Sequence, residues 1–166
     1  MSEVWVEHCD NKSVGVIVEN EYSDVALLKR ARFPVGMAFP SGHIDNHGSP
    51  EQTAVDEARE ELGLVLAISG LRQTVIQGRH VNNPCRRPGG GHHEWWVFET
   101  SEFEGELQPS ADEAKSAGWY SRAELQDLAD RTRAFQADQI PQTDWEASPG
   151  LEEVWLDFLT ELRYVE

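Results

Sequence analysis

A capped amphipathic helix in the first half of the chain constrains the fold more than any other feature. Ser49, followed by Pro50 and Gln52, is typical of a helix N-terminus, because Ser accepts from the backbone and Pro suits the first helical position. We expect Gln52 to complete a capping box. Gly63 suits the C-terminal cap, where the backbone turns left-handed. The sequence therefore predicts a helix over residues 50–62.

The two sides of this helix have opposite character. Glu57, Glu60 and Glu61 are spaced i, i+3 and i+4 and therefore share one flank. Like charges at this spacing repel by about 0.2–0.5 kcal/mol per pair, and a bound cation such as Mg²⁺ would turn that cost into a gain. A solvated acidic face is the alternative, and spacing alone favours it. The apolar stripe that must be buried consists of Ala54, Val55, Ala58 and Leu62.

Apolar runs on both sides of this helix predict strands, so the chain mixes helices and strands in an α/β or α+β fold. We expect one domain over residues 1–166. The predicted strands are 14–18, 25–28, 65–80 with a break near 69–70, 93–100, 105–108 and 118–120. A turn is predicted at 20–24, a loop or short-strand region at 32–41, and a loop at 82–91. Further helices are predicted after Ser121, capped with Glu124, and from about Gly150.

Composition argues against several classes of protein. The net charge of −16 argues against general binding to nucleic acid or to an anionic membrane. No apolar run approaches the roughly 20 residues that span a bilayer. The first residues lack the basic start and apolar core of a signal peptide. Cys9 and Cys85 are the two cysteines and need not be paired, so we expect a reduced, cytoplasmic protein.

One segment reverses the overall charge. Residues 62–93 contain no Asp or Glu, although these acids make up 30 of the 166 residues. Arg79, Arg86 and Arg87 lie in or beside the predicted 82–91 loop, and guanidinium groups suit phosphate oxygens. We predict that these three arginines bind substrate. The alternative is that they pair with excess acids elsewhere on the surface.

The segment that follows resembles a metal cluster only at first sight. Strand alternation directs His92 and Glu94 to one face and His93 to the other, which argues against zinc bound by these three residues. Trp95 and Trp96 face opposite ways for the same reason. We expect one of them in the core, whereas the other could line a base-stacking pocket.

Residues 42–64 resemble the Nudix box, and residues 39–42 and 119–125 resemble the segments that usually precede and follow it. Gly48 and Asp56 depart from the box, standing where it has a Glu and an Arg. The resemblance implies an α/β/α sandwich with a mixed central β-sheet. The seven of nine defined positions that match are Gly42, Glu57, Ala58, Glu60, Glu61, Gly63 and Leu64.

The same resemblance implies chemistry. It makes Glu57, Glu60 and Glu61 ligands of Mg²⁺, with Mn²⁺ as an alternative, and it makes Glu60 and Glu61 catalytic. Glu113 would join them as a further ligand or general base, or is a surface acid beside Asp112. The expected reaction is metal-dependent hydrolysis of the diphosphate linkage in a nucleoside diphosphate joined to another group. The resemblance also allows a homodimer.

The two departures leave a second interpretation open. In the family the missing Glu and Arg are thought to pair and brace the loop against the helix. Losing both leaves no unpaired charge, and Arg59 offers Asp56 a replacement partner. The alternative function is a catalytically weak or inactive Nudix domain that binds a nucleotide ligand. RNA binding ranks third, because the net charge opposes it.

Overall fold

The computed structural model describes residues 6–166, which form two sheets and the helices that cover them. The larger sheet has the order β4-β1-β6-β5 and is mixed, because β1 runs parallel to β6 and antiparallel to β4. The smaller sheet, β3-β2-β7, is antiparallel. The elements are β1 (Lys12–Val18), β2 (Val25–Arg30), β3 (Met37–Ala38), β4 (Ser41–His43), α1 (Pro50–Leu62), a 3₁₀ turn (Ile68–Gly70), β5 (Arg72–Val81), β6 (His93–Thr100), β7 (Ala114–Tyr120), α2 (Arg122–Gln136), α3 (Gln142–Ala147) and α4 (Glu153–Glu161).

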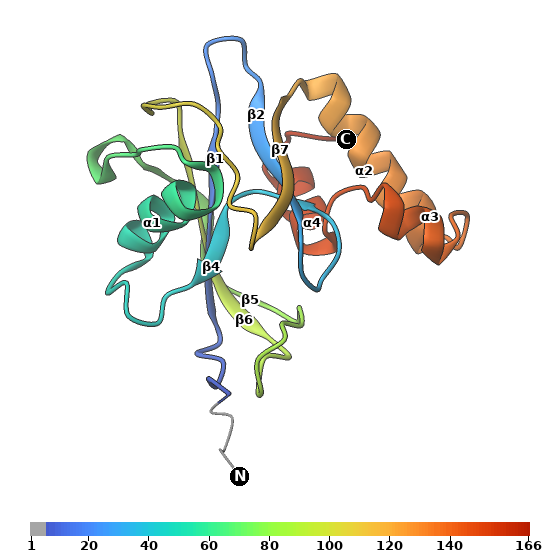
Figure 1. Cartoon of the computed structure of the whole chain (residues 1–166), viewed down its shortest axis with the longest axis horizontal. Helices are drawn as coiled ribbons and strands as arrows, with labels where there is room; N and C mark the ends of the chain where they lie inside the picture. The colour runs from blue at the N-terminus through green and yellow to red at the C-terminus, as the bar shows by residue number, and fades with distance from the viewer. Residues whose placement is uncertain (1–5) are drawn as a thin grey trace.

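Helices cover the sheets from two sides, with α1 on one and α2, α3 and α4 on the other (Figure 1). The apolar side chains of β1 are divided between these sides. Val14, Val16 and Val18 pack in the cluster that contains the apolar stripe of α1, whereas Ile17 packs in the cluster that contains α4. The predicted α/β/α sandwich with a mixed sheet is confirmed.

The caps of α1 explain its bounds and correct one detail. The Ser49 hydroxyl accepts from the Gln52 backbone N–H at 3.1 Å, and Gly63 closes the helix with φ of 74°. The Gln52 side chain, however, donates to Asp56 at 2.9 Å and does not accept from the Ser49 backbone N–H, as a capping box requires. Asp56 supplies a closer acceptor one turn along, so the expected capping box is wrong at this helix.

The strand expected over residues 105–108 is also wrong. Only Glu104 bridges to Val65 there, and the chain continues without a strand partner. The short helix α3 was not predicted, because Pro141 at its N-cap offers no side-chain acceptor. Its formation depends on tertiary packing, since buried Trp145 stacks on Phe135 with ring centroids 4.3 Å apart.

The two adjacent tryptophans do face opposite sides. Trp95 is 4% exposed and makes edge contacts with Trp155 and Phe158. Trp96 is half-buried against the cluster beneath α1 and lines none of the pockets described below, so its predicted role in base stacking is not supported. Across residues 6–166, no helix is long and apolar enough to cross a membrane.

Candidate active site

Three carboxylates converge where the segment that precedes β7 lies against α1. Glu57 and Glu61 lie one turn apart on α1, and Glu113 immediately precedes β7. Their oxygens all lie within 4.8 Å of one another. The backbone of Glu113 is held by Ala31, whose N–H donates to the Glu113 carbonyl at 3.1 Å beside an irregularity in the β2–β7 pairing. Two helical residues and one distant loop residue therefore form a single oxygen-rich group.

The backbone of β4 lies close to α1 and contacts two of these carboxylates. The Ser41 backbone N–H donates to Glu61 Oε1 at 2.8 Å. A Cβ at Gly42 would overlap the Glu57 carboxylate, so only glycine leaves room for that side chain. The first glycine of the box is thus required by packing against a metal-ligand candidate.

Burial makes the charges of this group costly. Desolvation, followed by the neighbouring Glu61 carboxylate, raises the pKa of Glu57 well above its ordinary value. Desolvation also raises the pKa of Glu61, and the hydrogen bond from Ser41 partly opposes this shift. A divalent cation among the three carboxylates would favour their ionised forms. The donor set is therefore the one that Mg²⁺ prefers, and it fits the ion that the box implies.

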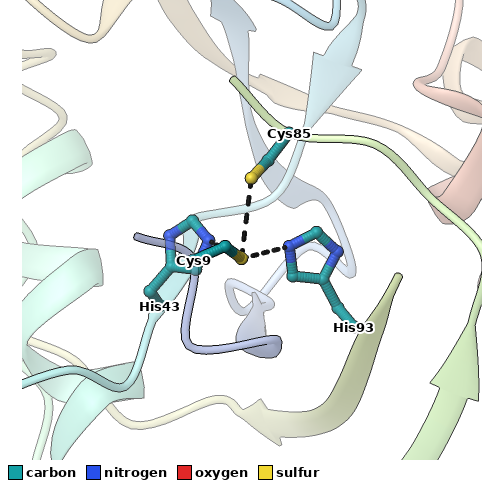
Figure 2. A group of neighbouring side chains, drawn as sticks. All are labelled: Cys9, His43, Cys85 and His93. Atoms are coloured by element: carbon teal, nitrogen blue, oxygen red, sulfur yellow. Dashed lines mark hydrogen bonds between the residues drawn. The ribbon is translucent and has the colours of Figure 1, made fainter. Parts of the chain in front are cut away.

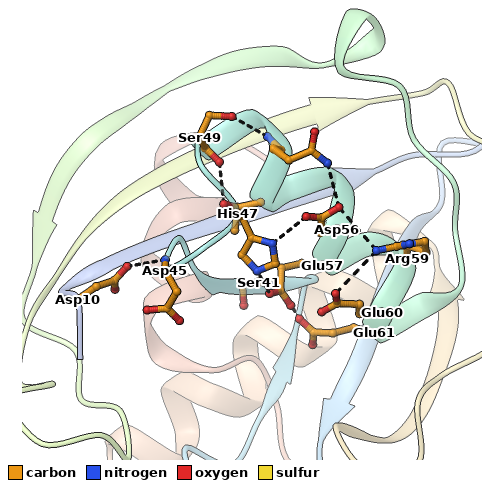
Figure 3. A network of polar contacts seen from close by, with 12 residues as sticks. Asp10, Ser41, Asp45, His47, Ser49, Asp56, Glu57, Arg59, Glu60 and Glu61 are labelled. Atoms are coloured by element: carbon orange, nitrogen blue, oxygen red, sulfur yellow. Dashed lines mark hydrogen bonds and ion pairs between the residues drawn. The ribbon is translucent and has the colours of Figure 1, made fainter. Parts of the chain in front are cut away.

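The third predicted ligand on the helix lies apart from this group. Glu60 is exposed, and its carboxylate lies 3.8 Å from the Arg59 guanidinium (Figure 3). It is not one of the carboxylates that lie within 4.8 Å of one another. Its roles as ligand and as catalytic residue stay predictions.

A polar pocket of about 260 Å³ opens over Glu57, Glu61 and Glu113. Arg86 is exposed at its wall, and Arg87 also lines it while donating to Asp45 at 2.8 Å. Two further arginines, Arg30 and Arg32, were not predicted, and they lie within four residues of the end of the predicted 25–28 strand. The four arginines lining the pocket are Arg30, Arg32, Arg86 and Arg87.

Arg79 does not belong to this pocket. Its guanidinium donates to both carboxylate oxygens of Glu161 on α4, at 2.7 and 2.8 Å. This contact pairs it with an acid elsewhere on the surface, as in the alternative interpretation of the acid-free segment. The structure therefore corrects the grouping of Arg79 with Arg86 and Arg87.

The loop before α1 is held against the helix by His47, a residue that was not predicted to have a role. His47 Nδ1 lies 2.7 Å from Asp56 Oδ2, and its other ring nitrogen lies 3.6 Å from Glu57 (Figure 3). Arg59, the expected partner of Asp56, is farther away at 3.7 Å. Burial alone would raise the pKa of Asp56, but the hydrogen bonds from His47 and Gln52 hold it below its ordinary value.

This brace reverses the polarity of the usual one. The acid now stands on the helix at Asp56, and the basic group stands on the loop at His47. Gly48 has φ of 94°, a backbone conformation that favours glycine, so a Glu at this position would be strained. The two departures from the box thus replace the brace and do not remove it.

Comparison with known proteins identifies the family. The NUDIX domain matches residues 10–143, which is most of the chain, and the chain belongs to this family. No protein of curated function matches the sequence.

Solved structures share the fold. The MutT protein from Methanosarcina mazei Go1 is 16% identical with a TM-score of 0.62, over 96% of each chain. A MutT NUDIX hydrolase from Burkholderia pseudomallei is 24% identical with a TM-score of 0.55, over 69% of this chain and 84% of that one. The NUDIX domain of Shewanella oneidensis NrtR, complexed with ADP ribose, is 16% identical with a TM-score of 0.57, over 98% and 92%.

Proposed function

We propose that this chain is a divalent-metal-dependent hydrolase that cleaves the diphosphate linkage of a nucleoside diphosphate joined to another group. One observation carries the proposal. The Glu57–Glu61–Glu113 carboxylates and four arginines line the same pocket, so a bound metal and an anionic substrate would meet there. This combination of acidic metal ligands and guanidinium groups suits a diphosphate, which needs both.

The carboxylates of α1 would hold Mg²⁺, or Mn²⁺ in its place. Such an ion supplies neutralisation of the diphosphate charge and polarisation of an attacking water. The Ser41 backbone N–H orients Glu61, and the missing side chain at Gly42 allows Glu57 to approach β4. Glu60 is proposed to join them when its contact with Arg59 opens.

The arginines would bind the phosphate oxygens. Arg86 has no ion-pair partner within residues 6–166, so its guanidinium is available to a ligand. Phe33 is 53% exposed and lines both this pocket and an adjoining, more apolar pocket of about 410 Å³. An aromatic face at that junction suits a nucleobase or the second moiety of the substrate.

The test is a panel of nucleoside diphosphate derivatives, assayed for phosphate-containing products with Mg²⁺, with Mn²⁺ and with chelator. The panel includes ADP ribose, which the structurally similar NrtR domain holds in its complex. Metal-dependent cleavage of at least one compound supports the proposal. Binding of a nucleotide with no cleavage under any metal condition would contradict it and would favour the binding-module alternative.

The role of Glu113 can be separated within the same assay. If Glu113 is a metal ligand, Glu113→Gln raises the metal concentration needed for half-maximal rate, and saturating metal restores turnover. If it is the general base, turnover stays low at saturating metal, by about 10²-fold or more. The matched control is Asp112→Asn, which changes the neighbouring acid and should leave both quantities unchanged.

A further inference from the structure

A second group of potential metal ligands lies beside the pocket and contains no carboxylate. It consists of Cys9, His43, Cys85 and His93, whose ligand atoms all lie within 4.8 Å of one another (Figure 2). Cys9 and His93 are buried, and the other two are half-buried. Both cysteines are free thiols. Two sulfurs and two imidazole nitrogens form a donor set typical of structural zinc sites.

The distances within this group match tetrahedral coordination. Zinc bonds of about 2.3 Å to sulfur and about 2.05 Å to nitrogen separate two sulfurs by about 3.8 Å, and sulfur from nitrogen by about 3.5 Å. The two sulfurs lie 3.7 Å apart. Cys9 Sγ lies 3.3 Å from His43 Nε2 and 3.2 Å from His93 Nε2. The three distances that involve Cys9 Sγ are thus each within about 0.3 Å of the tetrahedral values, and the remaining pairs of ligand atoms lie within 4.8 Å.

Hydrogen bonds outside the group orient its donors as a metal site requires. His93 Nδ1 donates to the Asn83 carbonyl at 2.9 Å, which leaves the lone pair of Nε2 directed at Cys9. The Asn83 side chain is fixed in turn by the Trp95 indole N–H at 3.0 Å. The Asn11 backbone N–H donates to Cys9 Sγ at 3.3 Å, a contact that stabilises a thiolate.

The fold gathers these residues from four separate segments. Cys9 precedes β1, His43 ends β4, His93 begins β6, and Cys85 lies in the β5–β6 loop. The pairings of β1 with β4 and with β6 align the strand ends that carry them. A Cβ at Gly90 would overlap the Cys85 sulfur, so glycine is needed for the loop to bring that thiol inward.

We propose that Cys9, His43, Cys85 and His93 bind one Zn²⁺ ion as a structural site, separate from the carboxylate site. On binding, the two thiols lose their protons to solvent, and two thiolates with two neutral imidazoles leave the site electrically neutral. All four positions are filled by protein, so no ligand position remains open for catalysis. The ion ties the segment before β1 and the β5–β6 loop to the end of the sheet.

This site would stabilise one wall of the active-site pocket. His43 and Cys85 line that pocket, and Arg86 and Arg87 directly follow Cys85. The Cys9 backbone N–H donates to the Pro88 carbonyl and already connects the two segments, and the Cys85 N–H donates to the Gly90 carbonyl within the loop. A metal bond to Cys85 would fix the start of the loop that presents both arginines.

The experiment uses the full chain without a histidine tag, produced with added zinc and purified without chelator. Zinc per chain is measured by inductively coupled plasma mass spectrometry. We expect about one zinc ion per chain in the wild type and less than about 0.2 in Cys85→Ser, because removing one ligand leaves the site incomplete. The matched control is His92→Gln, which removes an exposed imidazole next to His93 and should retain the ion.

A second measurement keeps the test decisive if Cys85→Ser does not fold. Metal-free wild type reconstituted with Co²⁺ should show the visible absorption of tetrahedral cobalt together with a sulfur-to-cobalt charge-transfer band. Wild type that binds neither Zn²⁺ nor Co²⁺ in this way would overturn the proposal. So would a Cys9–Cys85 disulfide without zinc in wild type produced with added zinc, or zinc that is lost from Glu57→Gln and retained by Cys85→Ser.

Discussion

The carboxylate group and the cysteine–histidine group border one pocket but are built differently. Glu57 and Glu61 come from one helix, where i, i+4 spacing already places them together. Cys9 and His93 come from segments more than eighty residues apart and meet only because β1 and β6 are adjacent. The first group offers hard oxygens that suit Mg²⁺, and the second offers sulfur and nitrogen that suit zinc. Adjacent sites can thus select different ions by donor type.

The largest expected effect is a loss of catalytic activity, and it distinguishes the carboxylate group from the cysteine–histidine group. Glu60→Gln and Glu61→Gln should each lower kcat/KM by about 10²–10³-fold at saturating Mg²⁺, because a metal ligand is lost. The melting temperature should stay unchanged or rise, because Glu61 is a buried carboxylate whose charge is costly. Steady-state kinetics and thermal melts measure both. Near-normal turnover in either variant would remove that residue from the metal site.

The control for this comparison lies on the same helix. Glu51 stands in the first turn of α1 and lines none of the described pockets. Glu51→Gln should therefore keep kcat/KM within about twofold of the wild type, because it changes one negative charge far from the reaction.

The next largest effect is a loss of thermal stability. Cys85→Ser should lower the Tm by about 5–10 °C, because loss of about 2–3 kcal/mol in a chain of this size moves the Tm by about 2–4 °C per kcal/mol. The Mg²⁺ concentration for half-maximal rate should not change. Differential scanning calorimetry of zinc-loaded protein is the measurement, with His92→Gln as control. An altered Mg²⁺ requirement with an unaltered Tm would show that the two groups are not separate in function.

A smaller effect tests the wall that the two sites share. Arg86→Ala and Arg87→Ala should each raise KM by about tenfold or less, and binding should become less sensitive to salt. Arg79→Ala is the matched control, because Arg79 pairs with Glu161 outside the pocket. Equal effects at Arg79 and Arg86 would show that the loss reflects overall charge and not pocket contacts.

The smallest effect concerns the brace beside the carboxylate group. A double-mutant cycle with His47→Ala and Asp56→Ala should give a coupling of about 0.5–1.5 kcal/mol in urea denaturation, as for a partly buried hydrogen bond. The corresponding cycle with Arg59→Ala should give less than about 0.5 kcal/mol, because that pair is longer and exposed. A larger coupling for Arg59 would restore it as the main partner of Asp56.

The elements predicted correctly from the sequence are those determined by residues that are close together in the chain. The bounds of α1 followed from Ser49 and Gly63, and β6 followed from one uninterrupted run over residues 93–100. The likeness to the Nudix box located Glu57 and Glu61, because both lie on one helix. For each of these elements, the residues that predict the structure lie within a few helical turns or a single strand.

The features that the sequence did not predict depend on distant partners. Residues 105–108 were expected as a short strand but have no neighbouring strand to pair with. His47 was overlooked because its role appears only when the loop folds back on Asp56. Cys9 and Cys85 were expected as unremarkable thiols, because no spacing rule connects them with His43. Spatial proximity of this kind requires the sheet order, which the sequence alone did not specify.

The reversed brace makes the loop and helix a coadapted unit. An Arg introduced at position 56 would face the His47 imidazole without its usual acid, and a Glu at position 48 would have to adopt φ of about 94°. Each single step toward the usual box should therefore be worse than either complete arrangement. A consensus sequence applied one residue at a time would weaken this protein. Exchange of residues 47–56 as one block avoids the unfavourable intermediates and leaves His43 in place.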